Sequence, residues 1–352
     1  MKKVVTIALV GFLLLITMIT TYADQKPVFR IAWSHYTGWE PWEYARQSGL
    51  LKKWGDKYGI DIQLDLINDY AESINLYTGG KYDGCAMTNM DALINPAAGG
   101  KDSTALIMGD FSNGNDGIVL VKGDSVKALK DKKVYLVMNT VSHYLLSQAL
   151  AKNNLKEREL KLVNVSDADI AAKYMSDNDP NCAVVTWNPM LMQVRNKKGA
   201  KMVFSSAQIP GEIMDLMVVR TDAPESLKKA LVGAWFATMQ IMSGGSKESN
   251  DAIKYMAQFA GGTEAEFRAQ LKTTAMFYTP AAAVDFTQSP KLKETMEYVR
   301  TFSFEKGLFG EGAKNKDFVG IQFSDGSIIG NPKNVKFRFD ANYMQMAAAG
   351  KL

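Results

Sequence analysis

Apolar segments of strand length alternate with longer amphipathic segments along most of the chain. Short runs rich in Val, Ile and Leu and bounded by Gly, Pro, Asn or Asp are typical of buried strands. Longer runs with apolar residues three and four positions apart indicate helices. The alternation predicts an α/β protein with mainly parallel sheets flanked by helices. The expected strands cover residues 28–33, 62–67, 85–88, 106–110, 118–122, 133–138, 161–165, 182–186 and 214–220.

The helical pattern is strongest between these strands and again toward the C-terminus. We expect helices over residues 41–58, 71–77, 90–98, 142–153 and 167–176, and a mainly helical stretch over 224–300. A polar hairpin is predicted over residues 318–329, because Ser-Asp-Gly at 324–326 suits a tight turn.

Two segments of the chain resemble each other. Residues 81–89 and 179–188 each contain a turn, a short strand that begins at Cys-Ala, and a polar loop. The length of 352 residues also exceeds what a single core usually supports. These observations favour two lobes whose loops face one cleft.

The first residues have the pattern of a secretory signal. Lys2 and Lys3 precede an apolar run over residues 4–19, and Thr21 and Ala23 are small residues at the positions that a signal peptidase reads. The alternative is a membrane anchor, but the run is shorter than the roughly 20 residues that span a bilayer. We therefore expect residues 1–23 to be a cleaved signal peptide and the mature protein to lie in the periplasm.

Composition and charge exclude several classes of protein. The formal charge of +4 falls to +2 when Lys2 and Lys3 are removed, and no basic stripe is interleaved with stacking aromatics, so nucleic acid is not an expected partner. Cys85 and Cys182 fall in different expected lobes, which predicts free, buried thiols. Two His and two Cys at wide spacing form no zinc pattern. We expect no metal, no cofactor and no catalytic residue.

The loops that follow the expected strands carry a chemical bias. Ligands of open parallel sheets bind outside the carboxyl ends of the strands. The loops at these ends are rich in aromatic and acidic residues, contain no Arg or Lys, and hold or adjoin Trp33, Trp39, Trp42 and Trp187. An anion would require basic groups or helix N-termini, whereas a small cation requires carboxylates and flat rings. The loops therefore favour a cation.

Ten residues are the candidates for ligand binding. Carboxylates would accept N–H bonds at the edge of the ligand, amides and a hydroxyl would complete the hydrogen bonds, and aromatic rings would cover its faces. The acids are Asp91, Asp116, Asp215 and Glu40; the other polar residues are Asn89, Asn188 and Ser142; the rings are Trp187, Trp39 and Tyr36.

Several of these residues have structural alternatives. Trp39, with Trp42, could pack a helix start onto the sheet; Asp91 could favour a helix N-terminus, and Asp116 could form a turn. Asp215 lies inside an apolar strand, where an unpaired carboxylate is costly, so it requires a partner. His35 and His143 are expected to be structural.

Spaced motifs in the chain resemble a known family. They are Val-x-x-Ile-Ala-Trp-Ser at 28–34, Gly-Leu-Leu at 49–51, Gly-Gly-Lys-Tyr-Asp at 79–83, Asp-x-Ser-x-Gly-x-Asp-Gly at 110–117 and Ser-His-Tyr-Leu-Leu at 142–146. In this order they are similar to the periplasmic component of nitrate/sulfonate/taurine-type ABC importers. The resemblance covers the mature chain and implies the two-lobed type II periplasmic-binding-protein fold.

A second set of motifs resembles one branch of that family. Thr-Asn-Met-Asp at 88–91, Val-Thr-Trp-Asn-Pro at 185–189 and Asn-Val-Lys-Phe-Arg-Phe-Asp at 334–340 are similar to the urea-carboxylase-associated branch. That resemblance implies uptake of guanidine as guanidinium. The absence of a basic residue from the loops departs from sulfonate and nitrate binders.

The resemblance also implies an organisation and a set of partners. Lobe 1 would comprise residues 24–115 and 217–352 and lobe 2 residues 116–216, with a hinge between them. A monomeric receptor would deliver its ligand to an inner-membrane ABC permease and its ATPase and would not be an enzyme.

Other readings stay open at this point. A receptor for a sulfonate, nitrate or another anionic or neutral solute could use the helix N-termini near Ser142 and Asn89. The same fold also hosts a thiamine-pyrimidine synthase, which would make the protein an enzyme.

Overall fold

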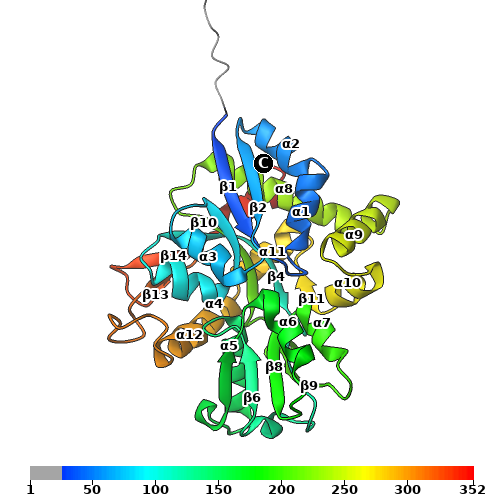
Figure 1. Ribbon diagram of the computed structural model, residues 1–352. Coiled ribbons are helices and arrows are strands. Elements are labelled where there is room, and N and C mark those ends of the chain that lie inside the picture. The colour runs from blue at the N-terminus through cyan, green and yellow to red at the C-terminus, as the bar shows by residue number, and fades with distance from the viewer. Residues whose placement is uncertain (1–25) are drawn as a thin grey trace, which may run out of the picture.

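The protein folds as two α/β lobes that meet at their central loops. The computed structural model describes residues 26–352, so the expected signal peptide lies outside the described residues. A nine-stranded sheet and a five-stranded sheet each carry helices on their faces (Figure 1). We call the larger sheet with its helices the large lobe, and the smaller sheet with α5, α6 and α7 the small lobe. The two-lobed α/β prediction is confirmed.

The large lobe is built on a mixed sheet of order β13-β12-β14-β4-β10-β3-β1-β2, with β11 paired to β4. Its strands are β1 (Val28–Trp33), β2 (Asp61–Leu66), β3 (Gly84–Thr88), β4 (Ser103–Ser112), β10 (Met214–Arg220), β11 (Thr274–Met276), β12 (Gly320–Gln322), β13 (Ile328–Ile329) and β14 (Val335–Phe339). The strands β1, β2 and β3 run parallel, whereas β10 is antiparallel to both of its neighbours.

The small lobe repeats this plan in the order β7-β6-β8-β5-β9. Its strands are β5 (Asp116–Leu120), β6 (Lys133–Leu136), β7 (Lys161–Asn164), β8 (Cys182–Trp187) and β9 (Lys201–Ser205). Here β6, β7 and β8 are parallel and β5 is antiparallel to its two neighbours. The sheets are thus more mixed than the expected parallel ones, because β5 and β10 enter from the opposite lobe rather than through a helical crossover.

Helices surround both sheets. They are α1 (Glu40–Gln47), α2 (Leu50–Lys57), α3 (Tyr70–Thr78), α4 (Asn89–Ala92), α5 (Val141–Lys152), α6 (Asp167–Ser176), α7 (Met190–Arg195), α8 (Glu225–Ser243), α9 (Lys247–Phe259), α10 (Glu264–Leu271), α11 (Pro280–Thr287), α12 (Pro290–Glu305) and α13 (Asn342–Ala348). The expected single helix over 41–58 is two helices, because Gly49 adopts a left-handed φ of 80° between them. The expected helix over 90–98 continues past α4 only as a π-helical turn, Leu93–Ala97, that contains Pro96.

The chain crosses between the lobes twice. The first crossing lies between the end of β4 at Ser112 and the start of β5 at Asp116. The return lies between β9 and β10, and β10 already pairs in the larger sheet from Met214 onward. Residues 214–216, which we expected in lobe 2, are therefore part of a large-lobe strand. No described helix is both long enough and apolar enough to cross a bilayer.

The interior strands carry the cores of the two lobes. Every residue of β3 and β8 is buried, and these are the two strands that contain the similar Cys-Ala sequences, at residues 85–86 in β3 and 182–183 in β8. Cys85 and Cys182 are free and buried in separate sheets, as predicted. The similarity between segments 81–89 and 179–188 thus corresponds to the same strand position in two related sheets.

Tight packing of α8 on α2 gives a test of the fold. Gly233 of α8 lies against the Trp54 indole, and a methyl group added there would overlap the ring. We expect Gly233→Ala to lower the free energy of unfolding by ~1–3 kcal/mol, because overpacking outweighs the better helix propensity of Ala. Thermal unfolding would measure the change. Gly312→Ala is the control, since its methyl group would contact nothing within 4 Å; equal melting temperatures for the two variants would contradict the packing.

Candidate ligand-binding cavity

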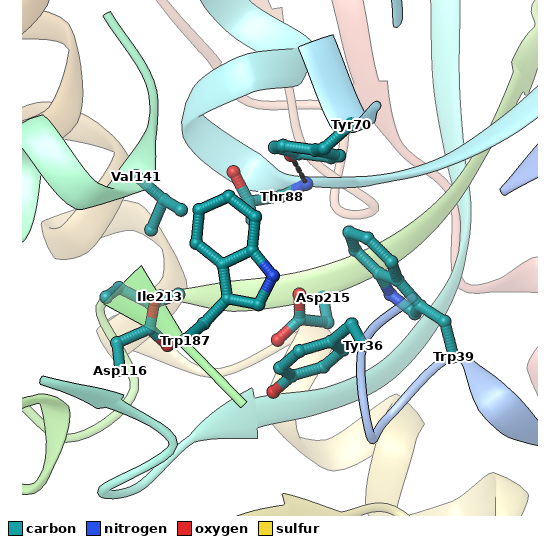
Figure 2. A pocket seen from close by; sticks show the side chains of 9 residues that line it. All are labelled: Tyr36, Trp39, Tyr70, Thr88, Asp116, Val141, Trp187, Ile213 and Asp215. Atoms are coloured by element: carbon teal, nitrogen blue, oxygen red, sulfur yellow. Dashed lines mark hydrogen bonds between the residues drawn. The ribbon is translucent and has the colours of Figure 1, made fainter. Parts of the chain in front are cut away.

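A small cavity lies where the two lobes face each other (Figure 2). Its empty space is about 250 Å³, including the part that opens to solvent. The space left between the lining side chains is narrow, so the cavity suits a small molecule. The lining residues are Tyr36, Trp39, Tyr70, Thr88, Ile213 and Asp215 from the large lobe, and Asp116, Val141 and Trp187 from the small lobe.

The two sheets supply the cavity through the same local arrangement. Asp215 is the second residue of β10 and pairs in register with Thr88, the last residue of β3. Asp116 is the first residue of β5 and pairs with Trp187, the last residue of β8. In each lobe a carboxylate at the start of an antiparallel strand thus lies beside the carboxyl end of a neighbouring strand. This explains why searching strand ends predicts part of the site.

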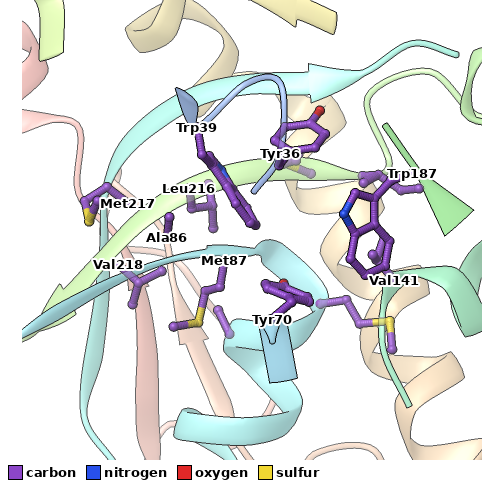
Figure 3. Packing of buried hydrophobic residues seen from close by; sticks show 14 of the residues in the cluster. Tyr36, Trp39, Tyr70, Ala86, Met87, Val141, Trp187, Leu216, Met217 and Val218 are labelled. Atoms are coloured by element: carbon purple, nitrogen blue, oxygen red, sulfur yellow. The ribbon is translucent and has the colours of Figure 1, made fainter. Parts of the chain in front are cut away.

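Four aromatic rings form a continuous wall (Figure 3). The Trp39 ring centroid lies 5.0 Å from that of Tyr36 and 5.5 Å from that of Tyr70. Tyr70 in turn meets Trp187 across the lobes, edge to face, with centroids 5.6 Å apart. All four rings are buried. Rings held in this way present flat apolar faces and leave the edges of the cavity to polar groups.

The carboxyl groups of the cavity are buried without a basic neighbour. Burial raises the pKa of Asp116 to about 7. The pKa of Asp215 is raised well above its ordinary range, first by burial and then by the nearby carboxylates Asp110 and Asp116. The Oδ2 atom of Asp215 has no hydrogen-bond partner among the described residues, and none of the lining residues is Lys, Arg or His. The local field therefore favours positive charge.

Five of the ten predicted residues line the cavity and five do not. Tyr36, Trp39, Asp116, Trp187 and Asp215 are lining residues. Asp91, Asn89, Asn188, Ser142 and Glu40 are all buried but are not among them. The geometry therefore does not favour direct contact between these five residues and a ligand.

Asp91 supports two lining residues from behind. Its Oδ2 atom accepts hydrogen bonds from the Tyr70 hydroxyl at 2.7 Å and from the Thr88 hydroxyl at 2.8 Å. The Tyr70 hydroxyl also accepts from the Thr88 backbone N–H at 3.0 Å. Thr88 caps the N-terminus of α4, and Asp91 lies in the first turn of that helix. Asp91 therefore has the role expected of an acid at a helix start and also positions Tyr70 and Thr88.

The other predicted polar residues hold the surrounding backbone or a neighbour. Asn89 accepts a hydrogen bond from the Met214 N–H at 3.0 Å and thereby ties α4 to β10. Asn188 donates to Asn115 beside the first crossing. Glu40 pairs with His35, with 2.7 Å between Oε1 and Nδ1, which uses its carboxylate away from the cavity lining. The Ser142 hydroxyl has no partner among the described residues.

Sequence reasoning missed Tyr70, Thr88, Val141 and Ile213. Thr88 immediately precedes the loop that supplied Asn89 and Asp91. Val141 is apolar, although it lies between the polar residues Thr140 and Ser142. Tyr70 follows β2, in a loop, Asn68-Asp69-Tyr70, that has the same acidic and aromatic character as the loops that supplied the candidates. The signal that could have found Tyr70 is its position at a helix start directly after a parallel strand.

Polar contacts join the lobes around the cavity. The Tyr70 N–H at the start of α3 lies 3.1 Å and 3.3 Å from the two carboxylate oxygens of Asp167, on α6 of the small lobe. The Tyr144 hydroxyl donates to Glu212 at 2.6 Å. Lys306, next to the end of α12, forms an ion pair with Glu157. The cavity is thus enclosed by contacts that depend on how the lobes meet.

The fold is that of the periplasmic binding proteins. The alkanesulfonate-binding protein SsuA of Xanthomonas axonopodis pv. citri, solved with MOPS, is 15% identical, with 82% of this chain and 96% of that chain covered at a TM-score of 0.65. The nitrate-binding protein NrtA of Synechocystis PCC 6803 is 14% identical, with 93% and 99% covered at 0.55. A Candida albicans protein described as having the generic periplasmic binding protein fold is 13% identical, with 78% and 90% covered at 0.57.

The sequence itself places the chain in a family. Residues 36–237 match the family model described as NMT1/THI5 like, so the chain belongs to the NMT1/THI5-like family. No curated protein sequence matches the chain. The family match spans the first crossing, the whole small lobe and the lining residues of the cavity.

The buried Asp116 predicts a pH dependence of stability. Its pKa of about 7 exceeds the ordinary value, so the native protein binds this proton more tightly than the unfolded chain does. The contribution of this group to stability therefore falls as pH rises from about 4 to about 7. We expect Asp116→Asn, in ligand-free protein, to gain stability relative to the parent between pH 5 and pH 7.5, by a few kcal/mol in order of magnitude.

Urea unfolding at the two pH values would measure this difference. The matched control is Asp285→Asn, which removes an exposed carboxylate from α11. If the parent and Asp116→Asn lose stability equally between the two pH values, Asp116 does not hold a proton in the native state.

Proposed function

We propose that this protein is the periplasmic solute-binding receptor of an ABC importer and that it captures a small nitrogenous cation, guanidinium being the best fit. The family, the fold and the position of the cavity between two lobes support the receptor class. The receptor closes around its ligand, performs no chemistry on it, and delivers it to an inner-membrane permease and its ATPase. The signal-peptide pattern of residues 1–23 supports export to the periplasm.

One observation carries the choice of a cation. The cavity places the carboxyl groups of Asp116 and Asp215 among aromatic rings and includes no basic side chain in its lining. A buried carboxylate without a partner is costly, and a bound cation supplies the missing charge. The sulfonate- and nitrate-binding proteins of the same fold take anions according to their names, and an acidic lining opposes an anion.

Guanidinium matches the shape of this lining. By analogy with the arginine head group it is planar, stays charged, and offers N–H donors around its edge with no acceptor. Asp116 and Asp215 approach from different lobes and can accept these donors, while Trp187, Trp39, Tyr36 and Tyr70 offer ring faces. Cation–π contact and carboxylate hydrogen bonds then act on different parts of one small ion.

The required binding energy is within reach of these groups. A micromolar Kd corresponds to ~8 kcal/mol, and each hydrogen bond to a charged group contributes ~1.5–3 kcal/mol. Two carboxylates and stacking suffice. Asp91 and Glu40 are not required as direct ligands.

Titration calorimetry of the mature protein would test the ligand class. We expect guanidinium chloride to bind, methylguanidine to bind more weakly because the cavity is small, and urea, taurine and nitrate to give no binding at equal concentrations. Binding of taurine or nitrate without binding of guanidinium would support the anionic alternative, in which the N-terminus of α5 at Val141 holds the ligand.

Asparagine substitutions would test the residues. We expect Asp116→Asn and Asp215→Asn to weaken guanidinium binding by ~10–100-fold, the loss of one charge-assisted hydrogen bond. Asp91→Asn should weaken it less, because that carboxylate holds Tyr70 and Thr88 rather than lining the cavity. Calorimetry with the Asp285→Asn control, alongside circular dichroism of each variant, would separate binding from folding. If Asp116→Asn and Asp215→Asn both bind guanidinium with unchanged affinity, the binding site is not in this cavity.

A thiamine-pyrimidine-synthase-like enzyme on the same fold is the alternative from another class. An enzyme would convert its ligand, whereas a receptor releases it unchanged. Recovery of intact guanidine after prolonged incubation with stoichiometric protein, followed by mass spectrometry, distinguishes the two.

A further inference from the structure

A second carboxyl group lies directly behind Asp215. Asp110 of β4 is the register partner of Asp215 in β10, and both side chains are buried. The Tyr36 hydroxyl donates to Asp110 Oδ1 at 3.0 Å. The Oδ2 atom of Asp110 has no partner among the described residues and lies against Gly38, where any side chain would overlap it. The backbone at Gly38 thus closes over this carboxyl group.

The contact between Asp110 and Asp215 requires a proton. Their carboxyl groups are buried on register partners of neighbouring strands, where directly opposite side chains lie close together, and two carboxylates without a proton would repel there. Carboxyl pairs of this kind share one proton because both cannot ionise together.

The groups that face the pair offer no positive charge. They are Tyr36 from the β1–α1 loop, Asn115 from the first crossing, Asp116 from β5 and Tyr278 from the segment before α11. Each is neutral or acidic. In the described part of the chain, a proton is therefore the positive charge available to this pair when no ligand is bound.

We propose that Asp110 and Asp215 hold one shared proton in the ligand-free protein and that a bound cation displaces this proton into solvent. The exchange balances: a singly protonated pair and a free cation become a doubly ionised pair with a bound cation, plus one released proton. Asp110 is then a residue that determines specificity for charge, since a neutral amide such as urea brings no charge to replace the proton. This inference rests on the proposed cation-binding function and deepens it.

Both carboxyl groups of the pair lie in the large lobe. β4, β10 and the β1–α1 loop that carries Tyr36 all belong to the large lobe. Asp116, in contrast, belongs to the small lobe. Burial raises the pKa of both carboxyl groups of the pair, that of Asp110 to about 7, which agrees with at least one proton on the pair near neutral pH.

The experiment is a direct measurement of released acid. Guanidinium chloride is added at saturating concentration to unbuffered mature protein at pH 6.5, and the acid set free is titrated back and compared with the ligand bound. We expect at least one proton per bound cation, one from the pair and a further fraction from Asp116, whose pKa is also raised to about 7. The affinity should rise with pH by up to about tenfold per pH unit for each proton released, for as long as the ligand-free protein holds that proton. Release of no acid on binding would overturn the proposal.

Variants assign the proton to the pair. In Asp110→Asn one carboxyl group is gone and the amide can donate to Asp215, so we expect binding to persist and acid release to fall by close to one proton relative to the parent, with the release from Asp116 remaining. Asp285→Asn, the exposed control, should release as much acid as the parent, and Asp116→Asn should still release the proton of the pair when saturated. Undiminished release in Asp110→Asn would overturn the assignment to this pair.

The outcomes separate this inference from the proposed function. If guanidinium does not bind at all, the proposed function fails and the proton exchange fails with it. If guanidinium binds without acid release, the cation receptor stands and only the shared proton is wrong. The parent protein alone decides this point, so the test holds even where Asp110→Asn does not fold.

Discussion

The structure around the cavity depends on one electrostatic constraint, which is that several buried carboxyl groups have no basic partner. Asp91, Asp110, Asp116 and Asp215 are all buried near the meeting of the lobes. The chain has basic residues enough to neutralise them, but its ion pairs lie elsewhere; Lys133 with Asp177 and Lys26 with Asp56 are examples near the surface. The hydroxyl group of Tyr36 donates a hydrogen bond to Asp110, and those of Tyr70 and Thr88 donate to Asp91, so these two carboxyl groups are partly stabilised.

This hydroxyl support is incomplete in a consistent way. Asp91, Asp110 and Asp215 each retain one carboxyl oxygen without a hydrogen-bond partner among the described residues. Such a deficit is expensive if it serves only the fold, because an unpartnered buried polar atom costs ~1–3 kcal/mol. Three of them within one region make better sense as the side of a site that a ligand or a proton completes.

Much of this arrangement was predictable from the sequence, and the remainder has identifiable causes. Local pattern fixed the bounds of β1 and β10, and the rule that strand ends face the ligand selected Tyr36, Trp39, Asp116, Trp187 and Asp215, which share the cavity lining. Glu40 is an acid in one of the loops that reach the cavity, but it lies in the first turn of α1 and its carboxylate pairs with His35. The spacing of residues along the sequence does not show in which direction such a side chain points. Asp110 was seen as the end of a strand and not as part of the site, because its partner Asp215 lies 105 positions away and pairs with it only through the antiparallel return of β10.

The division of the lining between the lobes links ligand charge to closure. Asp215 belongs to the large lobe and Asp116 to the small lobe, and the charge of Asp116 contributes to raising the pKa of Asp215. Bringing the two groups together in ionised form without a ligand is therefore opposed by repulsion, and each can remain there without a ligand by holding a proton. A cation between them converts that repulsion into two attractions, and the gain exists only where both acids reach the same ion. A ligand shifts a conformational equilibrium by its differential affinity for the two states, and for this site a positive charge supplies such a difference.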